Sequence, residues 1–141
     1  MTVPDPLTKF RFRVEIDGVT IQGFCEVTGL EISIEPIEYR EGGDRNIRKI
    51  PGLTKFGDVT LKRGITSAHE LEDWIKSVSE GQADRRNAVI ILLDEQRQEI
   101  ARWVLFNTFP RKWEGPDLNA KSNDVAMESL TLCVERLERS T

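Results

Sequence analysis

The stretch KFRFRVEIDGVTIQGF, residues 9–24, sets the class of fold. Apolar and charged residues alternate from Lys9 to Asp17, which is the period-two pattern of a half-buried β-strand. The pair Asp17-Gly18 is a two-residue turn signal, after which VTIQGF returns as the partner strand. The chain is therefore predicted to begin with a β-hairpin.

Five further segments have strand character. In the segment at 124–138, the apolar residues Leu130, Leu132 and Val134 are expected to point inward. The segment NAVIILLD contains an uninterrupted run of apolar residues, which predicts a fully buried strand. A loop is expected at 110–123, since its prolines and glycine break a ladder of hydrogen bonds. The segments are LEISIEPIEY (30–39), KFGDVTLKR (55–63), NAVIILLD (87–94), EIARWVLFNTF (99–109) and DVAMESLTLCVERLE (124–138).

One helix is predicted, over about residues 67–80. Ser67 and Glu70 have the spacing of a capping box, in which each side chain satisfies a backbone amide at the start of the helix. Gly81 supplies a left-handed stop. An apolar stripe at helical spacing should pack the helix on the sheet, and it consists of Leu71, Trp74, Ile75 and Val78.

These patterns predict a single domain over residues 1–141. The fold class is mainly β, a small β-barrel or sandwich of about seven strands with one flanking α-helix and a long extended loop at about 40–55. The length suffices to bury a core, and 38% hydrophobic with 31% charged residues is typical of globular chains.

The sequence predicts neither membrane anchoring nor a secretory signal. The longest apolar run, AVIILL at 88–93, is too short to span a bilayer. The first ten residues contain no apolar h-region. Synthesis in the cytoplasm is therefore expected. Cys25 and Cys133 form no CxxC pair and predict neither a disulfide framework nor a zinc site.

No enzymatic constellation is present, and no cofactor is expected. The one histidine, His69, has no partner histidine for a metal site. Neither a GxSxG elbow nor a phosphate-binding GxxxxGK[ST] loop occurs. Glu31 and Glu35 share a strand face at roughly 13 Å, beyond the roughly 5–9.5 Å over which paired carboxylates cooperate. The chain is predicted not to be an enzyme.

A basic segment interrupts the strands. YREGGDRNIRKIPGLTKFGDVTLKRG, residues 39–64, is rich in glycine and carries an excess of lysine and arginine, whereas the chain as a whole has a net charge of −4. A basic loop on an acidic body can recognise another copy of the same chain. A heterologous contact of that kind, repeated along an axis, builds an open filament.

An alternative function is a small β-barrel nucleic-acid-binding module that uses the basic 40–63 loop. Such a module needs aromatic side chains between its basic residues, and only Tyr39 and Phe56 flank the loop. Two strands also show polar faces, which fit either the solvated side of a sandwich or the wall of a wet lumen shared by several subunits.

Three long blocks carry a family resemblance. They are DPLTKFRFRVEIDG (5–18), the segment 39–64 quoted above, and ARWVLFNTFPRKWEGPDLNAKSNDVAMESL (101–130). The sequence resembles the tail tube proteins of contractile-tailed phages and the inner tube proteins of extracellular contractile injection systems. The resemblance extends from Asp5 to about Glu138.

The resemblance implies a structural subunit. Such proteins form hexameric rings of small β-barrel-like subunits, which stack into a rigid hollow tube inside a contractile sheath, on a baseplate and tipped by a spike. The implied partners are other copies of the chain, the sheath, baseplate and spike components, and a cargo effector or DNA in the lumen. The resemblance does not separate phage from injection system, or main tube from initiator ring.

The resemblance also implies residue roles. The long loop would pack onto the adjacent ring through Arg40, Gly42, Gly43, Arg45, Arg48, Lys49, Pro51, Gly52 and Lys55. The merged inner sheets would line the lumen, with candidates Glu31, Ser33, Glu35, Ser129, Thr131 and Glu135.

Overall fold

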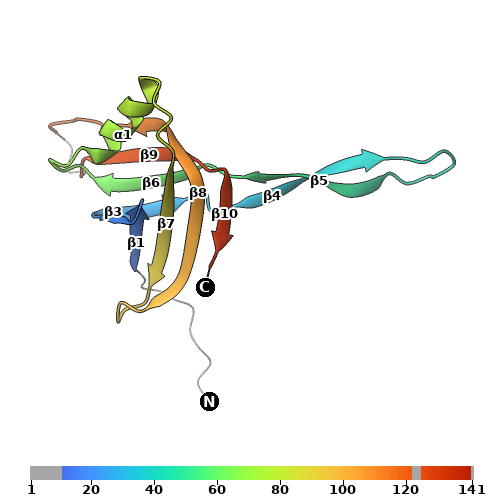
Figure 1. Ribbon diagram of the computed structural model, residues 1–141, viewed down its shortest axis with the longest axis horizontal. Helices are drawn as coiled ribbons and strands as arrows, with labels where there is room; N and C mark the ends of the chain where they lie inside the picture. The colour runs from blue at the N-terminus through green and yellow to red at the C-terminus, as the bar shows by residue number, and fades with distance from the viewer. Residues whose placement is uncertain (1–10, 122–124, 141) are drawn as a thin grey trace, which may run out of the picture.

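A computed structural model describes residues 11–121 and 125–140 (Figure 1). In chain order its elements are β1 (Arg11–Ile16), β2 (Val19–Ile21), β3 (Phe24–Thr28), β4 (Ile32–Tyr39), β5 (Arg48–Phe56), β6 (Val59–Gly64), α1 (Glu70–Ser79), β7 (Arg86–Leu93), β8 (Glu99–Glu114), β9 (Met127–Cys133) and β10 (Arg136–Arg139). The mainly β class with one helix is confirmed. The prediction of about seven strands was too low, because several predicted segments divide. Lys9 and Phe10 of the predicted first strand lie outside the described residues.

The predicted first hairpin is present. Ile16 of β1 pairs with Val19 of β2. Between them Asp17 and Gly18 have φ angles of 50° and 79°, as a two-residue turn with both central residues left-handed requires.

One antiparallel sheet of eight strands forms the body. Its strand order is β2-β1-β7-β8-β9-β6-β3, and β10 pairs with β8. The 16-residue strand β8 joins two halves, because it pairs first with β7 and β10 and then with β9. Both halves contribute to one cluster of buried side chains, so they pack as the two layers of a sandwich. The sheet does not close into a barrel, since β2 and β3 remain its ends.

The core lies between these layers. Leu130, Leu132 and Val134 are buried, as the alternation predicted. The prediction of a fully buried β7 was wrong: Ala88, Ile90 and Ile91 are buried, but Val89, Leu92 and Leu93 are partly exposed.

The helix packs on the core beside β8 (Figure 1). Its stripe places Leu71 and Trp74 in the core, each 1% exposed, with Val78 partly buried against it. Ile75, the fourth residue of the predicted stripe, is partly exposed. The helix begins at Glu70 without a side-chain cap, so the predicted capping box was wrong.

The helix ends at Ser79, and Gly81 provides the predicted left-handed stop, with a φ of 92°. The amides of Gly81 and Gln82 donate to the carbonyls of Val78 and Ser77 at 3.1 and 3.2 Å. This pair of bonds is the Schellman motif, which satisfies carbonyls at the end of a helix.

Two predicted boundaries differ. Strand β8 continues through Pro110 to Glu114, with a bulge beside Pro110. A proline is tolerated there because Pro110 lies beside a bulge, on a part of β8 that pairs with β9 alone among the described strands. The predicted last strand divides at Val134 and Glu135 into β9 and β10.

The predicted long loop is a hairpin. Strands β4 and β5 pair with each other along their length, and only 40–47 connect them. This hairpin, residues 32–56 and hereafter the arm, projects far from the body (Figure 1). The two strands cross in the view, as the strong twist of an isolated two-stranded ribbon requires.

Candidate assembly surfaces

The base of the arm is held by close backbone contacts. Gly29 has a φ of 94°, and a Cβ there would lie 2.0 Å from the carbonyl oxygen of Asp58. The amide of Gly57 donates to the carbonyl of Glu31 at 3.1 Å, and the Asp58 carboxylate accepts from Arg111 of β8. The arm therefore continues the β3–β6 pair from a fixed joint.

Large apolar side chains are exposed along the arm, although nothing in the described structure covers them. Soluble monomers rarely expose apolar patches above a few hundred Å², so this surface indicates a partner. The side chains and their exposed fractions are Ile32 57%, Ile34 56%, Ile37 50%, Tyr39 38%, Ile47 58%, Ile50 44% and Leu53 72%.

Many charged groups of the arm are paired within the arm itself. Arg48 donates to Asp44 at 3.2 Å. Lys49 lies 4.0 Å from Glu38, and Lys55 pairs with Glu35. Of the basic residues predicted to dock, only Arg40 and Arg45 have no ion-pair partner in the described part of the chain. Exposed pairs contribute little, so the apolar side chains dominate what the arm offers a partner.

A polar face covers the second layer of the sandwich, formed by β3, β6, β9 and the end of β8. Along β6 and β9, Leu61 and Leu130 point into the core, and the residues that alternate with them point outward. Thr60 and Thr131 pair across the strands, with hydroxyl oxygens 3.2 Å apart. This polar face consists of Glu26, Thr28, Thr60, Lys62, Lys112, Glu114, Ser129 and Thr131.

Opposite charges are interleaved on the polar face. Lys62 lies 3.7 Å from Glu26, and Lys112 pairs with Glu114. The Lys112 ammonium holds the pKa of the Glu114 carboxyl below its usual value, chiefly through this hydrogen bond. The face is therefore hydrated and close to neutral, without a field of one sign.

The structure does not bring the predicted lumen residues together. Ser129 and Thr131 lie on the polar face. Glu31, Ser33 and Glu35 belong instead to the arm and the residue before it. Glu135 follows β9 and lies 3.5 Å from Arg85.

The sequence analysis missed most of the polar face. In DVTLKRG the alternation of Val59 and Leu61 with Thr60 and Lys62 was a usable signal. Lys112 and Glu114 were not detectable, because Pro110 predicted the end of the strand.

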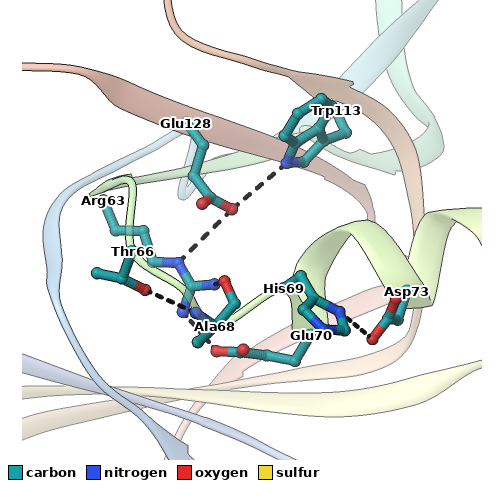
Figure 2. Close-up of polar contacts among 8 residues, drawn as sticks. All are labelled: Arg63, Thr66, Ala68, His69, Glu70, Asp73, Trp113 and Glu128. Carbon is teal, nitrogen blue, oxygen red and sulfur yellow. Dashed lines mark hydrogen bonds and ion pairs between the residues drawn. The ribbon is translucent and has the colours of Figure 1, made fainter.

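A buried polar cluster fastens the helix to this layer (Figure 2). Arg63 is 2% exposed and donates to Glu70 of α1 and, at 3.3 Å, to the carbonyl of Ala68. Its Nε lies 3.6 Å from Glu128, which also accepts from Trp113. The hydrogen bond from Arg63 holds the pKa of the Glu70 carboxyl below its usual value. Because Glu70 binds Arg63, its carboxylate is not available for the predicted capping box.

Residues 11–121 and 125–140 contain no group of three or more potential metal ligands. No helix among them is long and apolar enough to cross a bilayer.

Solved structures of tube components resemble the chain over nearly its whole length. A chain of the PVC sheath–tube complex of an extracellular contractile injection system in the extended state is 33% identical, with 96% of this chain and 92% of that chain covered and a TM-score of 0.87. The PVC sheath/tube terminator is 32% identical, with 99% of each chain covered and a TM-score of 0.86. A chain of the anti-feeding prophage cap is 28% identical, with 100% and 95% covered and a TM-score of 0.89.

More distant structures share the fold alone. Hcp1 from Flavobacterium johnsoniae is 11% identical, with 92% and 94% covered and a TM-score of 0.59. No curated protein sequence matches the chain significantly.

The fold, the exposed arm and these similarities define a structural tube protein of contractile injection machinery, and not an enzyme. The model of the family "T4-like virus tail tube protein gp19" matches residues 8–138, and the chain belongs to this family. The alternative function as a nucleic-acid-binding module finds no support in these comparisons.

Proposed function

We propose that the chain forms hexameric rings that stack into the rigid hollow inner tube of a contractile injection apparatus or phage tail. The single observation that carries this proposal is the family match over residues 8–138. Three features of the structure have a use in such a tube. They are the two open strand edges at β3 and the end of β8, the polar face, and the exposed arm.

Ring closure would use the open edges of the second layer of the sandwich, which carries the polar face and is hereafter the polar layer. Strand β3 pairs only with β6, and residues 109–114 of β8 pair only with β9 in the described structure. Unpaired edges bind other strands readily. An edge-to-edge contact of β3 with β8 of the next copy is heterologous and closes into a ring when the rotation permits. The joined polar layers would then form one continuous barrel that has no edges.

The polar face would line the lumen of that barrel. Ser129 and Thr131 keep the lumen role expected for them, and Thr60, Lys62 and Lys112 join them. A hydrated wall of paired charges has neither apolar patches nor a net charge to hold a passing cargo. Effector proteins or DNA are the cargo classes that such a conduit would carry.

The arm would dock onto the adjacent ring. Its nine predicted residues, from Arg40 to Lys55, all lie on the arm, and its exposed apolar side chains supply the area that docking requires. The docking role would therefore belong to the whole hairpin, residues 32–56, and not only to the loop at about 40–55.

The outer partners would be a contractile sheath and a baseplate. The PVC relatives were solved in a sheath–tube complex and a sheath/tube terminator. The assembled particle would be a phage tail or an extracellular injection particle.

Negative-stain electron microscopy across a concentration series tests the proposal. Hollow rings and stacked tubes that appear as the concentration rises would support it. Monodisperse monomers at all concentrations, with and without co-expressed neighbouring genes, would contradict it. A salt-sensitive shift of single-stranded DNA by the monomer would instead favour the nucleic-acid alternative.

A further inference from the structure

An apolar pocket of about 400 Å³ opens between the two layers of the sandwich, along the edge strand β3. One side of this pocket, hereafter the cleft, is formed by β3 and Leu30, and the other by β1, β7 and β8. Among the described residues Glu26 is the one charged group in the lining, and its carboxylate lies 3.7 Å from Lys62. The cleft therefore suits an apolar occupant and not an ion.

The cleft exists because the layer of β1, β7 and β8 extends past β3. In Figure 1 strands β9, β6 and β3 lie one below another, and β7 and β8 continue below β3. On the inner face of this overhang, Val14 and Leu105 are 1% and 0% exposed. Phe12, Leu92 and Trp103 lie on the same face and line the cleft, but they are partly exposed. Exposed apolar surface of this kind indicates a partner.

The start of β3 and the end of β8 lie at the same end of the polar layer. Phe24 of β3 pairs with Arg63 of β6, which pairs with Glu128 of β9. The next residue of β9, Ser129, pairs with Glu114, the last residue of β8. The residues that follow β8 therefore lie level with the start of β3, on the opposite edge of the layer.

The two edges also match in strand direction. Each neighbouring pair among β3, β6, β9 and β8 is antiparallel, so β3 and β8 run in opposite directions. A rotation about a ring axis leaves the direction of each strand along that axis unchanged. If β3 of one copy meets β8 of the next, the two strands are antiparallel and continue the sheet. The residues after Glu114 of the neighbour then lie beside the start of β3, at the cleft.

An apolar side chain is exposed at that position of the chain. Leu118 follows β8 by four residues and is 85% exposed, more than any other large apolar residue in the described structure. Isolated exposed leucines are common, but this one lies on the edge that faces the cleft of the next copy. The cleft and Leu118 are therefore an apolar recess and an apolar projection on opposite edges of one layer.

We propose that the cleft is filled by the neighbouring copy in the same ring, whose Leu118 inserts between β3 and the overhang. This inference rests on the proposed function, because it assumes that β3 pairs with β8 of that copy. It adds the apolar contact that seals the ring interface and names both of its sides. Backbone hydrogen bonds form between many strand edges, whereas the cleft selects the register that brings Leu118 to it.

Thiol cross-linking tests this contact directly, because the native Cys25 lines the cleft and is exposed. In a Cys133→Ser background, Leu118→Cys should react with Cys25 of the next copy when assembled particles are treated with a short bis-maleimide. The products should form a covalent ladder that ends at the size of one ring. The matched control is Leu53→Cys on the arm, at a position that is 72% exposed, and the baseline is the Cys133→Ser chain alone.

The outcomes separate the two proposals. Rings in the microscope with no more cross-linking from Leu118→Cys than from the baseline would overturn the cleft contact and leave the ring intact. A ladder from Leu53→Cys that extends beyond one ring, without one from Leu118→Cys, would place the arm of an adjacent ring in the cleft and would also overturn it. Absence of any ring or tube would overturn the contact and the proposed function together.

Substitutions at Leu118 give an independent test. Leu118→Glu should raise the concentration at which rings form at least about tenfold, which converts to about 1.4 kcal/mol per contact. Leu118→Met keeps an apolar side chain and should form rings at the parent concentration. Thermal unfolding of dilute monomer should be the same for both variants, because position 118 is exposed in the single copy. Equal ring formation by the two variants would contradict the contact.

Discussion

The Nε atom of Arg63 lies 3.6 Å from the Oε1 atom of Glu128, and both side chains are at most 2% exposed. The pair joins neighbouring strands β6 and β9, and Arg63 continues from it to Glu70 at the start of α1. One buried guanidinium therefore links the polar layer to the helix.

Removing one member of this pair should be strongly destabilising. Arg63→Met leaves the Glu128 carboxylate buried and unpaired, which costs about 3–5 kcal/mol. The double variant Arg63→Met, Glu128→Leu should be less destabilised than the single one, because both buried charges are gone. Urea unfolding of dilute monomer measures the free energy of unfolding of each variant. A loss of stability in the double variant equal to the sum of the losses in the two single variants would refute the coupling.

Stability should fall at acidic pH in a way that depends on Glu70. Its pKa is lowered in the folded state, chiefly by the hydrogen bond from Arg63. The ionised carboxylate therefore stabilises the fold above the unfolded-state pKa, and this contribution is lost as the pH falls through the folded-state pKa. The urea midpoint should drop more between about pH 6 and about pH 3 in the parent than in Glu70→Gln. Parallel pH profiles would contradict the assignment.

The joint of the arm should tolerate no side chain at position 29. Gly29→Ala would place a Cβ 2.0 Å from the Asp58 carbonyl oxygen at a φ of 94°, so both a clash and backbone strain oppose it. We expect a lower thermal midpoint and fewer tubes. Gly64→Ala is the matched control, because Gly64 has ordinary φ and open space around it and lies outside the arm. Equal behaviour of the two variants would argue against a fixed joint.

The apolar side chains of the arm should matter for assembly and little for folding. Ile37 and Ile50 pair across the arm and are 50% and 44% exposed. Replacing both with Ser should cost the monomer only about 0.2–1 kcal/mol but should reduce tube assembly, as measured by microscopy and sedimentation. Val19→Ser is the control, because Val19 is an apolar residue on β2, outside the arm, and is 62% exposed. Loss of monomer stability in proportion to loss of tubes would refute the distinction.

Local signals in the sequence determined much of the fold. Alternation identified the strands and the inward direction of Leu130 and Leu132, Asp17-Gly18 identified the first turn, and the apolar stripe with Gly81 identified the helix and its end. These features depend on residues that are close together in the chain, so their patterns can be recognised without knowing the tertiary contacts. The family resemblance, carried by three long blocks, identified the tube function before any contact was known.

Only the tertiary structure decided where the functional surfaces lie. Pro110 does not end β8 because a bulge beside it lets the pairing with β9 continue. Glu70 does not cap the helix because Arg63 of β6 binds it. Ser129 and Glu35 both looked like lumen residues, but one belongs to the body and the other to the arm. Each outcome depends on how strands that are distant in the sequence pair in the sheet. The period of two along a strand shows that its residues alternate between two faces, but it does not show what each face contacts.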